Sequence, residues 1–76
     1  MGNNGLPTKA QLERLRATYP QGTRVELVST SDPYTKLTPG TKGTVNLVDS
    51  AGTIQISWDN GSDLGMIPGE DVVRKL

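Results

Sequence analysis

The stretch GTIQISWDNGSDLGMIPGEDVV, residues 52–73, carries the clearest fold signal in this chain. Its apolar side chains at Ile54, Ile56 and Trp58 alternate with polar ones, which is typical of a strand with one buried face. The DNG triplet at 59–61 supplies residues that tolerate the positive φ angles of a tight hairpin turn. This pattern predicts a β-hairpin with Trp58 on the inward face of its first strand.

The same period of two recurs upstream in TRVELV and GTVNLV, and a weaker version follows the DNG turn. We predict five short strands, over residues 23–28, 43–48, 53–58, 63–67 and 72–75. Their inward positions predict a core of Val25, Leu27, Val45, Leu47, Ile54, Ile56, Trp58 and Leu64. Short strands, tight hairpins and one long first connection are typical of a small SH3-like barrel, in which closure hides the strand edges.

One short amphipathic helix is predicted before the strands, over residues 8–18. Thr8 and Gln11 have the spacing of a capping box, and Leu12 and Leu15 recur at helical spacing. Because a helix of three turns is marginal alone in water, we expect both leucines to dock on the barrel. The fold class is therefore mainly β with one N-terminal helix. The expected division is a disordered tail (1–6), a docked helix (7–20) and an SH3-like barrel (21–76).

Composition limits the chemistry that the chain can perform. Its 76 residues suffice for one domain with a thin core. It has no cysteine and no histidine, which excludes disulfides, zinc sites of the usual kind and imidazole catalysis. The acidic residues at 59, 63, 70 and 71 match no calcium-loop spacing. We therefore expect no metal, no cofactor and no enzymatic activity.

Membrane association is not expected from the sequence. No apolar run approaches the roughly 20 residues of a membrane span, and the N-terminus lacks the apolar core of a secretory signal. We expect a cytoplasmic protein.

Charge is balanced overall but divided unevenly along the chain. Eight basic and eight acidic residues give a net charge of zero, so the overall basic field of a nucleic-acid binder is absent. Residues 1–42 hold six basic and three acidic side chains (net +3), and residues 43–76 hold two basic and five acidic ones (net −3). Folding either pairs the two halves or leaves a dipole.

The candidate binding residues lie on the long first connection and on the helix. The connection STSDPYTKLTPGTK, residues 29–42, is long for so small a domain, and such loops often carry recognition. We single out Asp32, Tyr34 and Lys36 there; the alternative is a turn capped by Asp32 with Tyr34 lying over the barrel. Lys9 and Arg16 share one helical face, as a contact for an acidic partner or as a solvated surface.

Trp58 is interpreted as a core anchor, with ligand contact as the alternative. Because a buried indole N–H requires an acceptor, we expect a carbonyl or carboxylate of the first connection to accept from it.

The segments YPQGTRVEL, DPY, PGTKGTV, VD, GTI, WDNGSDLG and GED together resemble a family. It is an uncharacterised small domain of unknown function found in phages, plasmids and other mobile elements of Gram-positive bacteria. The resemblance runs from Tyr19 to the C-terminus and implies no catalytic or binding residues. A looser similarity, through GTV at 43–45 and WDNG at 58–61, is to the SH3-like substrate-binding domain of Mind-bomb-type ubiquitin ligases. The tryptophan-rich first loop of that domain is missing here.

These observations predict a non-enzymatic protein-interaction module. The mobile-element resemblance implies an accessory protein that binds a host or phage protein complex, such as a defence or nuclease complex that it inhibits. The alternative is a small nucleic-acid-binding β-barrel, because most of the Lys and Arg residues lie in the first half. The identity of the partner and the oligomeric state stay open.

Overall fold

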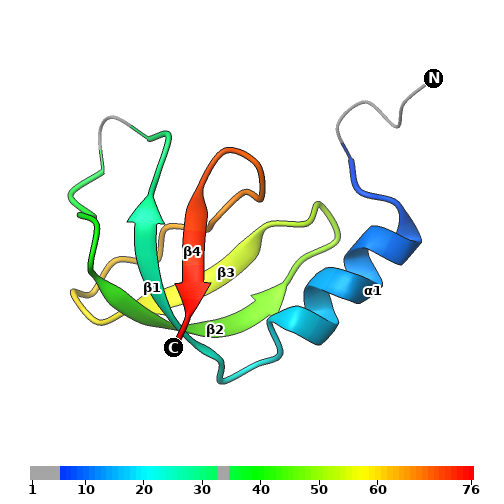
Figure 1. Ribbon diagram of the computed structural model, residues 1–76, viewed down its shortest axis with the longest axis horizontal. Coiled ribbons are helices and arrows are strands. Elements are labelled where there is room, and N and C mark those ends of the chain that lie inside the picture. The colour runs from blue at the N-terminus through cyan, green and yellow to red at the C-terminus, as the bar shows by residue number, and fades with distance from the viewer. Residues whose placement is uncertain (1–5, 33–34) are drawn as a thin grey trace.

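The computed structural model of the chain describes residues 6–32 and 35–76. Tyr34 and residues 1–5 of the tail predicted over 1–6 lie outside the described residues. The elements follow in the order α1 (Lys9–Thr18), β1 (Arg24–Ser29), β2 (Lys42–Val48), β3 (Ile54–Trp58) and β4 (Val72–Lys75) (Figure 1). The prediction of a mainly β chain with one short N-terminal helix is confirmed.

The four strands form one antiparallel sheet in the order β3-β2-β1-β4. β2 and β3 make a hairpin, whereas β4 returns from the far end of the chain to pair with β1. Within the described residues, β3 and β4 are the two edges of this sheet, which is open.

The described residues show four strands in an open sheet and not the predicted five strands with closure. The segment over 63–67 is not a strand. It contributes one bridge, in which Met66 and Ile54 exchange backbone hydrogen bonds of 2.8 and 2.9 Å. Bonded residues alternate along an antiparallel ladder, so the Ile67 amide faces away from Ile54, and it donates to the carboxylate of Asp71 at 2.8 Å. The next residue that would face β3 is Pro68. Pro68 has no N–H to donate. The ladder consequently ends at Met66.

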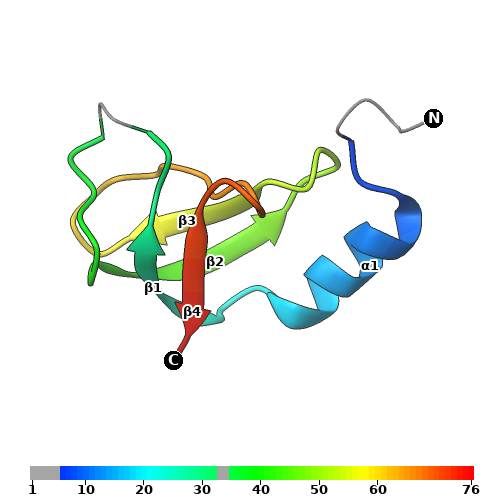
Figure 2. The ribbon, with the colours of Figure 1, turned by 45° about the horizontal axis from the view of Figure 1, so that its top comes forward.

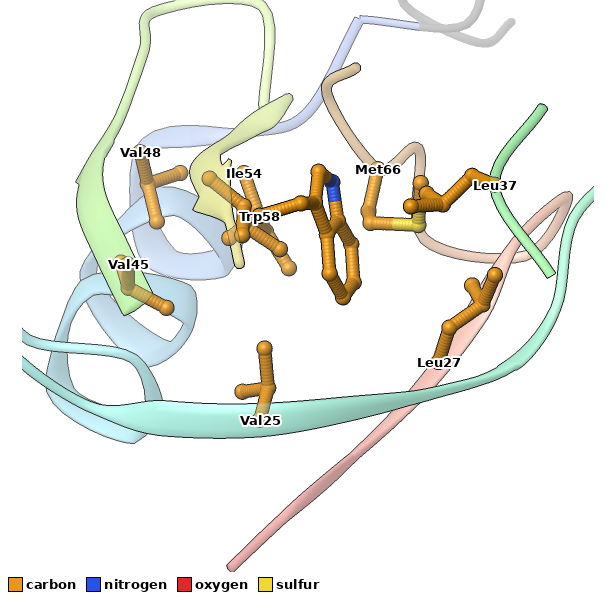
Figure 3. Close-up of a cluster of buried hydrophobic side chains, with 9 residues drawn as sticks. Val25, Leu27, Leu37, Val45, Val48, Ile54, Trp58 and Met66 are labelled. Atoms are coloured by element: carbon orange, nitrogen blue, oxygen red, sulfur yellow. The ribbon is translucent and has the colours of Figure 1, made fainter. Parts of the chain in front are cut away.

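In the described part of the chain, nine apolar residues from the sheet and its connections form the core. Figure 3 shows the Trp58 ring with Ile54 on one side and Met66 on the other, and the β1 side chains Val25 and Leu27 below them. The buried set is Val25, Leu27, Leu37, Val45, Val48, Ile54, Ile56, Trp58 and Met66. Of the other predicted core residues, Leu12, Leu15 and Leu64 are half-buried and pack against this cluster. Leu37, Val48 and Met66 were not predicted.

Leu47 was wrongly assigned to the core, since 52% of it is exposed. The register shifts between Val45, which pairs with Ile56, and Leu47, which pairs with Gln55. The strand therefore has one extra residue at a β-bulge, and the faces exchange after it. Val48 points inward in place of Leu47.

Trp58 is 3% exposed and anchors the core. Its indole Nε1 donates to the carbonyl of Leu64 at 2.8 Å, so the expected acceptor in the first connection was wrong. The neighbouring strand makes room for the ring with a glycine, because a Cβ at Gly43 would lie 2.8 Å from Trp58 Cε3 and 2.7 Å from Ile56 Cγ2. The indole N–H is therefore hydrogen-bonded, and the ring is packed, within the molecule.

Helix α1 begins at the predicted capping box and lies at one end of the sheet (Figures 1 and 2). The Gln11 amide donates to Thr8 Oγ1 at 3.1 Å, and the Thr8 amide donates to Gln11 Oε1 at 2.8 Å. All ten helical residues are described and none is buried. The helix contacts the core through Leu12 and Leu15, which form a narrow apolar stripe. It is the one helix of the described chain, and it is neither long nor apolar enough to cross a membrane.

Two ion pairs among the described residues lie on the surface of the sheet. Arg24 binds Asp59 through two bonds of 2.7 and 2.8 Å, and this hydrogen bonding lowers the pKa of Asp59. Arg74 donates to Glu26 at 2.6 Å. The first pair links the basic first half of the chain to the acidic second half. Exposed pairs of this kind contribute little to stability, because solvent screens them.

Candidate binding groove

The structure does not bring the predicted binding residues together. Asp32 and Lys36 lie in the connection between β1 and β2, at the opposite end of the molecule from α1, which carries Lys9 and Arg16 (Figure 1). Lys9 and Lys36 are exposed, and Asp32 is half-buried. Arg16 Nε donates to the backbone carbonyl of Val48 at 3.2 Å, which ties this side chain to β2.

A groove runs instead between α1 and the segment that leads into β4. It consists of two adjoining hollows, of about 330 and 230 Å³, which share Leu15 and Pro68. We call it the α1–β4 groove. The larger hollow is lined by Pro7, Gln11, Leu15, Ala51, Gly52, Ile67 and Pro68. The smaller is lined by Leu15, Tyr19, Ile54, Met66, Pro68, Gly69, Asp71, Val72 and Val73.

Local chain geometry keeps this groove open. Among the described elements, α1 packs against β2 and not against β4. After Met66 the chain turns tightly, with the amides of Glu70 and Asp71 donating to the carbonyl of Ile67 at 3.0 and 2.9 Å. Gly69, with φ of +93°, allows this turn. The helix and the turn are thus the two walls, and residues of β3 and Met66 are between them.

Asp71 holds the turn to the rest of the sheet. Its Oδ1 accepts from the Ser31 amide and from Thr30 Oγ1, both at 2.8 Å, and its Oδ2 accepts from the Ile67 amide at 2.8 Å. Burial raises the pKa of Asp71, but the hydrogen bonds from Ile67, Ser31 and Thr30 outweigh it, and the pKa lies below its ordinary value. The carboxylate is therefore a structural anchor with both oxygens engaged.

The chemistry of the groove is that of a contact surface. Its lining is mainly aliphatic, with Asp71 as its one charged residue. Ile67 and Val72, which flank the turn, are 45% and 48% exposed. In the described part of the chain no three His, Cys, Asp or Glu side chains gather as metal ligands. The groove offers apolar area and shape rather than reactive groups.

The sequence analysis missed the groove because its walls are far apart in the chain. Tyr19 ends the helix, whereas Val72 and Val73 begin the last strand, and only the fold brings them near each other. One local signal was available. Ile67 and Val72 are large apolar residues on either side of the polar turn PGED, and the open sheet leaves both without cover.

The chain matches a known family over most of its length. The family described as Domain of unknown function (DUF4314) matches residues 8–76. The matched part includes α1 and all the strands described above, and so both walls of the groove. The expectation of an uncharacterised small domain family is confirmed. Neither a curated protein nor a solved structure matches the chain significantly.

Proposed function

The chain belongs to this family, and we propose that it is a non-enzymatic protein-interaction module that binds its partner in the α1–β4 groove. The observation that carries the proposal is the groove itself, an open apolar hollow bordered by exposed Ile67 and Val72. Apolar concave surfaces with few polar groups are the usual form of a binding site.

Charge supports a protein partner over a nucleic acid. No Lys or Arg lines the described groove, whereas phosphate contacts rely on those side chains. Lys9 on α1 and Lys36 in the connection between β1 and β2, two of the exposed cations, lie at opposite ends of the molecule (Figure 1).

We extend the proposal to the cellular role of the protein and to its structural relatives. The sequence resemblance supports a phage or mobile-element accessory protein that acts in the cytoplasm on a host or phage protein complex, as an inhibitor of a defence or nuclease complex. The antiparallel strand order and the long connection between β1 and β2 support a relationship to SH3-like barrels. If this chain is an SH3-like barrel that does not close, the α1–β4 groove lies where the barrel is open.

A matched pair of variants tests the proposed function. Ile67 borders the groove and Val28 does not, yet both are 45% exposed. Ile67→Lys and Val28→Lys add the same charge at equally exposed aliphatic sites. We expect the tagged chain and its Val28→Lys variant to retain the same protein from a lysate of the native cell, and Ile67→Lys to lose it.

The same pair addresses the nucleic-acid alternative. An added lysine strengthens phosphate binding, so stronger retention of DNA or RNA by Ile67→Lys, with affinity falling steeply as salt rises, contradicts the proposal. Equal retention of a protein by all three forms also contradicts it, because the groove is then not the binding surface.

A further inference from the structure

We propose that the partner enters the α1–β4 groove as an extended aliphatic segment that pairs with β4 as an added strand. This inference rests on the proposed function and states how the partner binds. Strand addition to a sheet edge is a common way to recognise peptides: the backbone provides affinity and alternate side chains provide specificity.

The first support is that β4 has a free edge. It lies at the end of the sheet and pairs only with β1 among the described strands. The Leu76 amide donates to the carbonyl of Arg24 at 3.0 Å. Because hydrogen-bonded residues alternate along an antiparallel pair, Arg74 also faces β1. The amides and carbonyls of Val73 and Lys75 therefore face away from it.

The second support is that this free edge faces the groove. Val72 and Val73 line the smaller hollow, and no residue of β1 does, so the hollow lies on the side of β4 away from β1. Figures 1 and 2 both show β4 between β1 and the side that α1 occupies. An added strand lies over Ile54 and Met66, with Leu15 on the opposite wall. Its inward side chains must be aliphatic to match these residues.

The third support is charge. The one charged lining residue, Asp71, has both carboxylate oxygens bonded within the molecule, so a neutral apolar segment meets no unpaired charge there. Lys75, at the end of the free edge, is exposed and takes part in neither ion pair of the described chain. It favours an acidic residue at one end of the partner segment. A charged lysine also opposes edge-to-edge pairing of two copies.

The test uses a defined probe, a phage-displayed library of random twelve-residue linear peptides selected on the full chain. A selected peptide is then titrated against Lys75→Pro and Lys75→Ala. Both variants lose the charge, but only proline removes the outward N–H. Loss of one backbone hydrogen bond corresponds to about tenfold in affinity. We expect Lys75→Pro to bind about tenfold more weakly than Lys75→Ala.

Hydrogen exchange on the unmodified chain provides an independent readout. The Val73 and Lys75 amides should exchange freely without peptide and become protected with it, while the Arg74 amide is protected in both cases. Selected peptides should carry alternating aliphatic residues and a terminal acidic one.

Three results overturn the inference. Equal binding to Lys75→Pro and Lys75→Ala, together with loss on Ile67→Lys, rejects strand addition but leaves the groove as the binding site. A failed selection, or peptides indifferent to all three variants, rejects the groove as a peptide site. If the chain self-associates and this protects the Val73 and Lys75 amides, a second copy of the chain, and not a partner segment, occupies the groove.

Discussion

The surroundings of Trp58 and the α1–β4 groove are both apolar. They differ in whether their polar groups are hydrogen-bonded and their apolar side chains covered. Around Trp58, the indole N–H bonds the Leu64 carbonyl at 2.8 Å, and a glycine clears space for the ring. Along the groove, Ile67 and Val72 stay about half exposed, and the outer edge of β4 pairs with no strand of the described chain. The difference locates stability in the first region and recognition in the second.

The largest effect is expected from emptying the Trp58 site. Trp58→Ala should destabilise the chain by about 3–5 kcal/mol, because a buried aromatic side chain is lost and a cavity remains. In a domain this small that is most of the total stability. Thermal unfolding followed by circular dichroism checks it. A folded Trp58→Ala variant with a near-native Tm would contradict the assignment of stability to the Trp58 region.

The anchor beneath the groove should show a smaller, pH-dependent effect. Asp71→Asn places an amide where two backbone N–H groups and a hydroxyl now donate, and should cost about 1–3 kcal/mol at pH 7. Because the folded pKa of Asp71 lies below the unfolded one, its contribution is present above about pH 4 and is lost as pH falls through the folded pKa.

Unfolding of both forms across pH 2–7 measures this contribution. The Tm difference between wild type and Asp71→Asn should be full at neutral pH and shrink in acid. A difference that grows as the pH falls has the wrong sign for a carboxylate stabilised in its charged form.

The helix stripe should contribute less again. Leu12 and Leu15 are half-buried, so each change to Ala should cost about 1–2 kcal/mol, below the 2–5 kcal/mol of a fully buried leucine. Leu15 lines the groove and Leu12 does not. The two variants should therefore match in urea midpoint and differ in partner binding. Unequal stability with equal binding would place Leu15 in the core alone.

The smallest effect on stability is expected at the rim of the groove. Ile67→Lys and Val28→Lys alter equally exposed side chains, and each should change stability by no more than about 0.5 kcal/mol. Urea unfolding checks both. A large loss on Ile67→Lys alone would mean that Ile67 supports the turn, and the loss of a partner would then need another explanation.

Local pattern explains how much of the fold was predictable. Thr8 and Gln11 interact within one turn, and Ile54, Ile56 and Trp58 alternate within one strand, so both elements follow from adjacent residues. The prediction that Leu47 is buried was wrong because of a β-bulge. The bulge depends on the pairing of β2 with β3, which the strand's own sequence does not show. The strand predicted over 63–67 is reduced to one bridge at Met66. Pro68 has no N–H for the next bond of the ladder, and the Leu64 carbonyl accepts from the Trp58 indole, a contact that the segment's own sequence does not show.

The binding site was less predictable than the fold for the same reason. Lys9, Arg16, Asp32 and Lys36 were chosen as polar residues left over after the core was assigned, and the fold separates them. The groove depends on apolar residues from three distant segments and on an edge that only the strand order reveals. Its one local trace was the pair of uncovered aliphatic residues around the PGED turn.

The most direct test of the central claim is amide chemical-shift mapping of the isotope-labelled chain titrated with its captured, unlabelled partner. The groove account predicts that the largest changes fall on Leu15, Ile67 and Val73, with the amides around Trp58 nearly unmoved. Changes confined to the connection between β1 and β2, over residues 35–41, with Leu15 and Val73 unaffected, would contradict it and place recognition on the loop.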